Sequence, residues 1–137
     1  MPDIDEFYII TVAGMCIYSK SRRSEIDQSL FAGFMTALNS FSKEISSETI
    51  KSFKLGKTKY VISTSDQLLF IAKTDVKAKE ENVYKTLKEM EAIFFEKFPP
   101  EMMKNEWDGN LDMFSALDAQ YDRYLSDSEE KMRSSIW

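Results

Sequence analysis

The strongest pattern of apolar and polar positions lies in residues 24–45 and predicts one amphipathic helix. Its apolar side chains recur every three or four residues, which places them on one side of a helix: Ile26, Leu30, Phe34, Leu38, Phe41 and Ile45. Such a face is too hydrophobic to leave in water, so we expect the helix to cover a sheet and to bury Phe34 and Leu38 in the core. Ser24 or Asp27 is expected to cap its first turn.

Two apolar segments before this helix predict a β-hairpin. Residues 6–13 are dominated by apolar and β-branched side chains, which is typical of a central strand that is covered on both faces. Gly14 follows as a turn, and residues 15–20 are expected to return as the second strand.

Three further strands are predicted after the helix. Residues 48–55 alternate between apolar and polar side chains with one slip of phase. Residues 59–63 and 68–73 are apolar and rich in strand-forming side chains, and turn residues separate the three segments.

Two helices are predicted in the last third of the chain. Residues 77–98 repeat apolar side chains at helical spacing, and the helix should end at Pro99 because proline cannot continue the hydrogen-bond ladder. Residues 111–125 are expected to form the last helix. We therefore expect one domain over residues 1–125, followed by a polar tail over residues 126–137.

The composition is that of an ordinary globular domain. With 137 residues, 43% of them hydrophobic, the chain can bury a core without disulfides. Its net charge of −5 gives no support for a nucleic-acid partner. The acidic N-terminus does not resemble a signal peptide, and no apolar run approaches the ~20 residues of a membrane span. We expect a cytoplasmic protein, at most peripheral to membranes.

The residues offer little support for catalysis. The chain has no histidine, which removes the commonest general base and metal ligand. Cys16, the single cysteine, lies in a predicted strand without a histidine to activate it, and the four glycines are isolated rather than grouped in a phosphate-binding loop. We therefore expect no enzymatic activity, no cofactor and no metal.

The order of predicted elements and the sequence LFAGFMTALNSFSKEI at residues 30–45 resemble the longin domain, as does the hydrophobic hairpin that bends at Gly14. The resemblance covers residues 7–125. It implies an α/β (α+β) fold with the element order β-β-α-β-β-β-α-α. The five strands would form an antiparallel sheet in the order 2-1-5-4-3, between one helix on one face and two helices on the other.

The resemblance also implies a function. Longin domains are typically non-enzymatic interaction modules that act as scaffolds or adaptors in small-GTPase regulation or membrane trafficking. Their partners are other longin or roadblock domains, including a second copy of the same chain, or a small GTPase. A small-molecule-sensing domain of similar sheet-and-helix shape is the alternative, because apolar pockets leave no linear motif.

The strand at residues 15–20 is the first candidate binding site. It is an expected sheet edge, and it carries no charge or proline before Lys20 to prevent strand pairing. In related modules this strand and the first helix form the interface between two longin domains. The candidate contact residues are therefore Met15, Cys16, Ile17, Tyr18, Gln28, Ala32 and Thr36.

A basic segment is the second candidate site. Lys51, Lys54, Lys57 and Lys59 occur without an acidic residue among them, and they could bind an anionic lipid or an acidic partner. Lysines on an edge strand also prevent edge-to-edge aggregation, which is the favoured interpretation.

Overall fold

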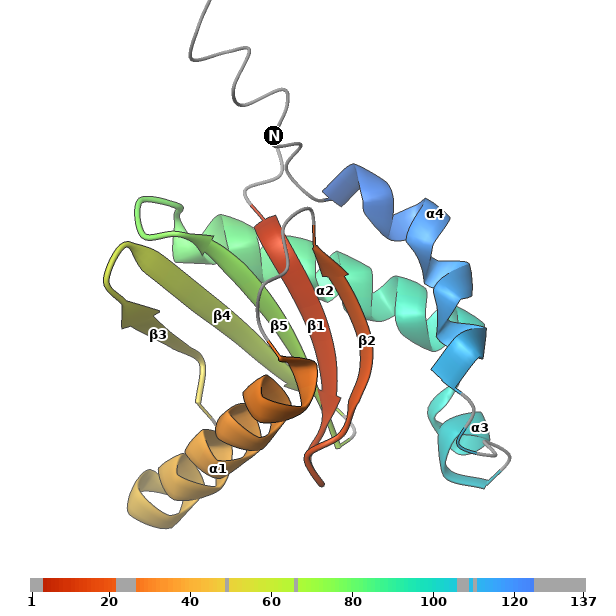
Figure 1. Ribbon diagram of the computed structural model, residues 1–137, viewed down its shortest axis with the longest axis horizontal. Coiled ribbons are helices and arrows are strands. Elements are labelled where there is room, and N and C mark those ends of the chain that lie inside the picture. The colour runs from red at the N-terminus through yellow and green to blue at the C-terminus, as the bar shows by residue number, and fades with distance from the viewer. Residues whose placement is uncertain are drawn as a thin grey trace, which may run out of the picture.

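Five strands form one antiparallel sheet in the order β2-β1-β5-β4-β3 (Figure 1). The computed structural model describes residues 4–21, 27–48, 50–65, 67–105, 109 and 111–124. The strands are β1 (Ile4–Thr11), β2 (Cys16–Ser21), β3 (Ser52–Leu55), β4 (Thr58–Ser65) and β5 (Leu68–Asp75). The predicted fold class and strand order are confirmed. The phase slip at residues 48–55 has a simple cause, since the strand begins only at Ser52.

Helices cover both faces of the sheet (Figure 1). They are α1 (Gln28–Ser46), α2 (Glu80–Lys97), α3 (Pro100–Asn105), η1 (Leu111–Leu117), α4 (Asp118–Tyr121) and η2 (Asp122–Tyr124). The helix expected over residues 111–125 is wrong as one regular element, because short 3₁₀ and α turns replace it. Polar side chains in this segment form hydrogen bonds with backbone groups that a regular helix would use itself. The Ser115 hydroxyl, for example, donates to the Asp112 carbonyl at 2.8 Å.

The core on the α2 side has the pattern that the sequence predicts. Phe7 and Ile9 of β1 lie there, fully buried, with Phe70 of β5. The apolar side of α2 packs onto them through Val83, Leu87, Met90, Phe94 and Phe98 at its end. The Phe70 and Phe94 rings meet edge to face, with centroids 5.6 Å apart.

The core on the α1 side is smaller. Tyr8 and Ile10 of β1 lie on this face, and Phe31, Ala32 and Met35 of α1 pack against it. The Phe31 ring lies 4.5 Å from the Tyr8 ring, centroid to centroid. α1 therefore buries a short patch near its N-terminus, while residues 44–48 are all exposed and the helix extends past the sheet (Figure 1).

The predicted orientation of α1 is wrong. Four residues of the apolar stripe that should face the sheet are instead exposed to solvent: Leu30 (74%), Phe34 (48%), Phe41 (62%) and Ile45 (68%). Leu38, the other residue expected in the core, is only partly buried. α1 has two apolar sides, and the sheet takes the one that holds Ala32, whose small side chain allows close approach. Apolar spacing identifies a face that must be covered, but not the neighbour that covers it.

The start of α1 agrees with one of the two expected caps. The Asp27 carboxylate accepts a hydrogen bond from the Leu30 backbone N–H at 3.0 Å. The alternative cap Ser24, the stripe residue Ile26 and the predicted tail at 126–137 lie outside the described residues.

Two alanine substitutions on α1 test this orientation. Met35→Ala removes a fully buried side chain, so it should cost about 2–5 kcal/mol of unfolding free energy. Phe41→Ala removes a larger but exposed side chain and should cost less than about 1 kcal/mol in the monomer. Urea unfolding at low protein concentration measures both. A reversed order of the two values would contradict the orientation.

Candidate protein-interaction surfaces

The exposed stripe of α1 continues onto strand β3. The centroids of the Phe34 and Phe53 rings are 6.1 Å apart. The Phe53 ring in turn stacks on the Tyr60 ring, with centroids 4.8 Å apart. Leu55, two residues after Phe53 on the same face of β3, is 56% exposed. β3 lies at the end of the sheet and pairs with β4 alone among the described strands. An apolar helix face and an edge strand thus form one surface, which we call the α1–β3 surface.

The predicted basic segment lies beside this surface but loses one member. Lys51, Lys54 and Lys57 are exposed. Lys59 is only 8% exposed, and its ammonium donates a hydrogen bond to the Ala78 carbonyl at 3.0 Å. Lys59 is therefore wrong as a surface residue, because it faces the α2 side of the sheet, where the turn after β5 covers it. For the other three, binding of an anion and protection of the edge remain predictions.

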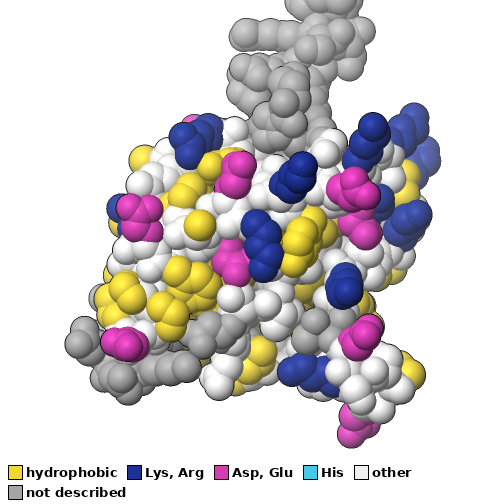
Figure 2. Space-filling view, turned by 180° about the vertical axis from the view of Figure 1, so that it is seen from behind, with side chains coloured by type: hydrophobic (Ala, Val, Ile, Leu, Met, Phe, Trp, Pro, Cys, Tyr) yellow, Lys and Arg dark blue, Asp and Glu magenta, His cyan; other side chains and the backbone are white. Residues whose placement is uncertain are grey.

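The α2 side carries charges of both signs. Figure 2 shows acidic and basic side chains interspersed with apolar ones over this face. The Lys88 ammonium lies 3.4 Å from a Glu91 carboxylate oxygen and 5.4 Å from the centre of the Tyr84 ring. Such a mixture is typical of a solvated helix face.

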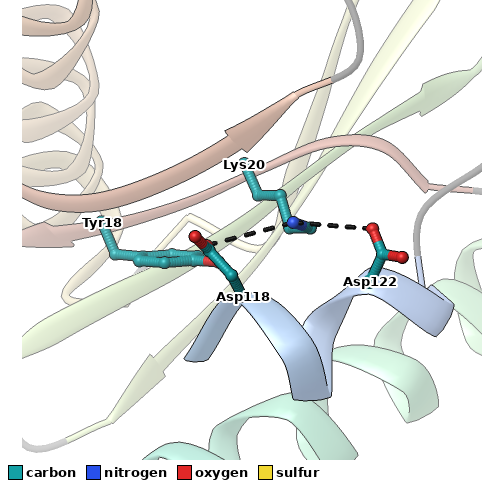
Figure 3. A network of polar contacts seen from close by, with 4 residues as sticks. All are labelled: Tyr18, Lys20, Asp118 and Asp122. Atoms are coloured by element: carbon teal, nitrogen blue, oxygen red, sulfur yellow. Dashed lines mark hydrogen bonds and ion pairs between the residues drawn. The ribbon is translucent and has the colours of Figure 1, made fainter. Parts of the chain in front are cut away.

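Strand β2 is an edge strand, as predicted, but two of its candidate contact residues are buried. Ile17 is 3% exposed and Tyr18 is 7% exposed, and both belong to the core on the α2 side. The Tyr18 hydroxyl donates to the Asp118 carboxylate at 2.6 Å, and the Lys20 ammonium lies 3.9 Å from Asp118 and 3.6 Å from Asp122 (Figure 3). These contacts hold the C-terminal segment α4–η2 along β2.

The structure does not bring the other candidate contact residues to one surface. Ala32 is fully buried under α1 and is wrong as a contact residue. Thr36 is partly buried, and the side chain of Gln28 lies outside the described part of the chain. Met15 (49% exposed) and the partly buried Cys16 remain predictions. In the sequence, the helical part of the α1–β3 surface is visible only as an apolar stripe, and such a stripe predicts a core face equally well.

The chemistry of Cys16 fits a structural residue. Burial raises the pKa of the Cys16 thiol, which reduces the thiolate fraction on which nucleophilic attack depends. The thiol donates a weak hydrogen bond to the Tyr18 carbonyl at 3.4 Å. Across the described residues no three His, Cys, Asp or Glu side chains lie together as a metal site would need. None of the described helices is long and apolar enough to cross a membrane.

A partly buried ion pair joins two central strands on the α1 side. The Lys73 ammonium lies 2.7 Å from one oxygen of Glu6, which is 2% exposed, and the Tyr8 hydroxyl donates to the other oxygen at 2.8 Å. Burial acts to lower the pKa of Lys73, but the hydrogen bond and the charge of Glu6 outweigh it and raise this pKa above its ordinary value. Lys73 therefore stays charged and compensates the charge of Glu6 between β1 and β5, so removal of either partner alone would leave an uncompensated charge there.

Sheet order, helix placement and element order together define a domain of the longin and roadblock class. The sequence model described as "First Longin domain of FUZ, MON1 and HPS1" matches residues 5–95. The chain belongs to this longin family. No curated protein sequence matches the chain.

Solved structures of this class share the fold at low sequence identity. MglB of Myxococcus xanthus is 13% identical, with a TM-score of 0.54 over 69% of this chain and 85% of that chain. A Roadblock/LC7 domain from Streptomyces avermitilis is 12% identical, with a TM-score of 0.56 over 74% and 88% of the two chains. The mammalian SRP receptor structure is 13% identical, with a TM-score of 0.51 over 96% and 99%. These similarities show the fold alone.

The buried tyrosines predict a loss of stability in alkali. Burial raises the pKa of Tyr8, Tyr18 and Tyr121 above the ordinary value of 10.0, and the neighbouring carboxylates Glu6 and Asp118 raise the first two further. These groups stay neutral in the folded state, whereas they ionise in the unfolded state above about pH 10. The stability should therefore be complete below about pH 10 and fall above it.

Urea unfolding from about pH 8 to about pH 11 measures this loss, and ultraviolet absorbance reports tyrosine ionisation. Ionisation of all six tyrosines near pH 10.0 in the still-folded protein would contradict their burial.

Proposed function

We propose that this chain is a non-enzymatic longin-type interaction module that pairs with a second longin or roadblock domain through the α1–β3 surface. The observation that carries the proposal is the uncovered apolar stripe of α1. Apolar patches of more than a few hundred Å² on soluble domains usually mark interaction sites. Fully burying one large apolar side chain contributes roughly 1.5–3 kcal/mol, so covering four of them provides a strong driving force.

The spacing of the stripe favours a helix as the opposing element. Phe34, Leu38, Phe41 and Ile45 follow one another by four, three and four residues. This alternation is the spacing of a two-helix seam, in which each side chain packs between residues of the facing helix. The stripe from Leu30 to Ile45 spans about 23 Å at 1.5 Å per residue. The partner proposed here therefore contributes an apolar helix face of similar length.

The edge of β3 supports a pairing of two similar domains rather than docking of a lone helix. Its outward backbone groups can accept a strand, and the phenyl ring of Phe34 connects this edge to the helix face through Phe53. A partner with the same two elements covers both at once. A second copy of this chain would place the same surface on both sides of a two-fold axis.

The wider role follows from membership of the longin family. In this proposal the paired domains act as a scaffold or adaptor in small-GTPase regulation or membrane trafficking. The protein works in the cytoplasm, with at most peripheral membrane contact. A small-molecule sensor is the alternative. Two open surface cavities among the described residues have volumes of about 270 and 330 Å³, near the lower end of the roughly 300–1,000 Å³ that is typical of ligand pockets.

Phe41→Asp tests the pairing. It places a charge on the exposed stripe and should weaken association at least about tenfold without unfolding the domain. Tyr84→Asp is the matched control, since Tyr84 is 40% exposed on α2, on the opposite side of the sheet. Sedimentation across a range of concentrations measures self-association.

If the chain pairs with another protein rather than with a second copy, a photo-crosslinking amino acid at position 41 identifies that partner in native cells. Crosslinks to a longin or roadblock domain, or to a second copy, support the proposal. A domain that stays monomeric at high micromolar concentration and forms no such crosslink would refute it.

A further inference from the structure

The exposed stripe of α1 is symmetric about its own midpoint. Its members match across that midpoint, aliphatic with aliphatic and aromatic with aromatic: Leu30 with Ile45, and Phe34 with Phe41. The midpoint of both pairs falls between Ala37, which is exposed, and Leu38, which is partly buried. When two such helices lie antiparallel, each exposed side chain meets one of its own kind on the facing helix. A second copy of α1 therefore matches the stripe along its whole length.

The charges of α1 favour this antiparallel arrangement over a parallel one. Glu44 is exposed near the C-terminal end of the helix, where the helix dipole disfavours a negative charge. The first turn of α1 contains no acidic residue. An antiparallel copy places its Glu44 at the level of Phe31, in that first turn, where the dipole favours a negative charge. A parallel copy would instead bring the two Glu44 carboxylates and two like dipole ends together.

The exposed area of the stripe is sufficient for a specific dimer. Each of its four exposed side chains leaves on the order of 100–150 Å² open, so two copies bury on the order of 1,000 Å², where specific interfaces begin. Leu55 of β3, which is 56% exposed, extends the same surface. The small side chain of Ala37 at the midpoint allows the two helices to approach closely.

We propose that the partner on the α1–β3 surface is a second copy of this chain, whose α1 packs antiparallel to the first across a two-fold axis between Ala37 and Leu38. The Phe34 side chain of one copy packs beside Phe41 of the other. This inference rests on the pairing proposed above and narrows it to one partner and one direction. The same surface is used on both copies, so association stops at the dimer.

Spin labels outside the stripe measure the direction of the two helices. Ser29 and Ser46 are exposed and lie equally far from the midpoint, on opposite sides of it. Ser29→Cys and Ser46→Cys are each made in a Cys16→Ser background, because Cys16 is the single cysteine. In the antiparallel dimer, two labels at position 29 should lie at least about 25 Å apart, at 1.5 Å per residue along the helix.

A mixture of the two labelled variants should give a much shorter distance, because position 29 of one copy then lies beside position 46 of the other. Double electron–electron resonance measures both distances. A short distance between two labels at position 29 would mean parallel helices and would overturn the proposal, as would equal distances in the two samples.

Glu44→Lys separates self-pairing from the stability of the fold. A lysine suits the C-terminal end of α1, so the urea midpoint of the dilute monomer should stay the same or rise. The dissociation constant of the dimer should nevertheless increase at least about threefold, because the lysine meets the first turn of the facing helix. Glu89→Lys on α2 makes the same charge change at an exposed position and should alter this constant by less than about twofold. An unchanged constant for Glu44→Lys would contradict the antiparallel contact.

Photo-crosslinking at position 41 distinguishes a failure of this inference from a failure of the proposed function. Crosslinks to a second copy, with the antiparallel label distances, support the inference. Crosslinks to a different longin or roadblock domain, from a chain that stays monomeric at high micromolar concentration, would overturn the inference and leave the proposed function standing. A monomeric chain that forms neither crosslink would overturn both.

Discussion

The structure depends on the burial of β1 and β5 on both faces of the sheet. Phe7 and Ile9 point to one side and Tyr8 and Ile10 to the other, and none of the four is more than 1% exposed. Two strands of this kind need a cover on each face. α2 and the C-terminal segment cover one face along its length. α1 covers less of the other face, where Phe31, Ala32 and Met35 pack against the sheet and the Phe34 ring meets Phe53 of β3.

This unequal cover explains why α1 is proposed as an interaction element. One side of α1 anchors the helix to the sheet through Phe31, Ala32 and Met35. Another side presents an apolar stripe from Leu30 to Ile45 that is largely exposed. The same helix can therefore serve the fold with one side and a partner with the other. β3, with only four residues, leaves the neighbouring sheet edge open beside the stripe.

Much of the fold could be predicted from the sequence. The apolar runs at 6–13 and 68–73 identified the central strands, and the spacing along α2 identified its buried side, because each segment has one dominant pattern. α1 has two apolar sides, and periodicity cannot say which one meets the sheet. Lys59, Ile17 and Tyr18 are wrong as surface residues for a related reason: their burial depends on the turn after β5 and on α4, which lie far away in the sequence.

Solvent paramagnetic relaxation of methyl groups tests whether the apolar stripe of α1 is exposed in the free domain and covered by a partner in the assembly. It would be measured by NMR on the dilute domain and on the assembly isolated from native cells. In the dilute domain, the methyls of Leu30 and Ile45 should relax strongly and those of Ile10 and Ile71 weakly, since only the first two are exposed. In the assembly, Leu30 and Ile45 should become as protected as the core. Protection of both residues in the dilute domain, or unchanged exposure in the assembly, would contradict the account.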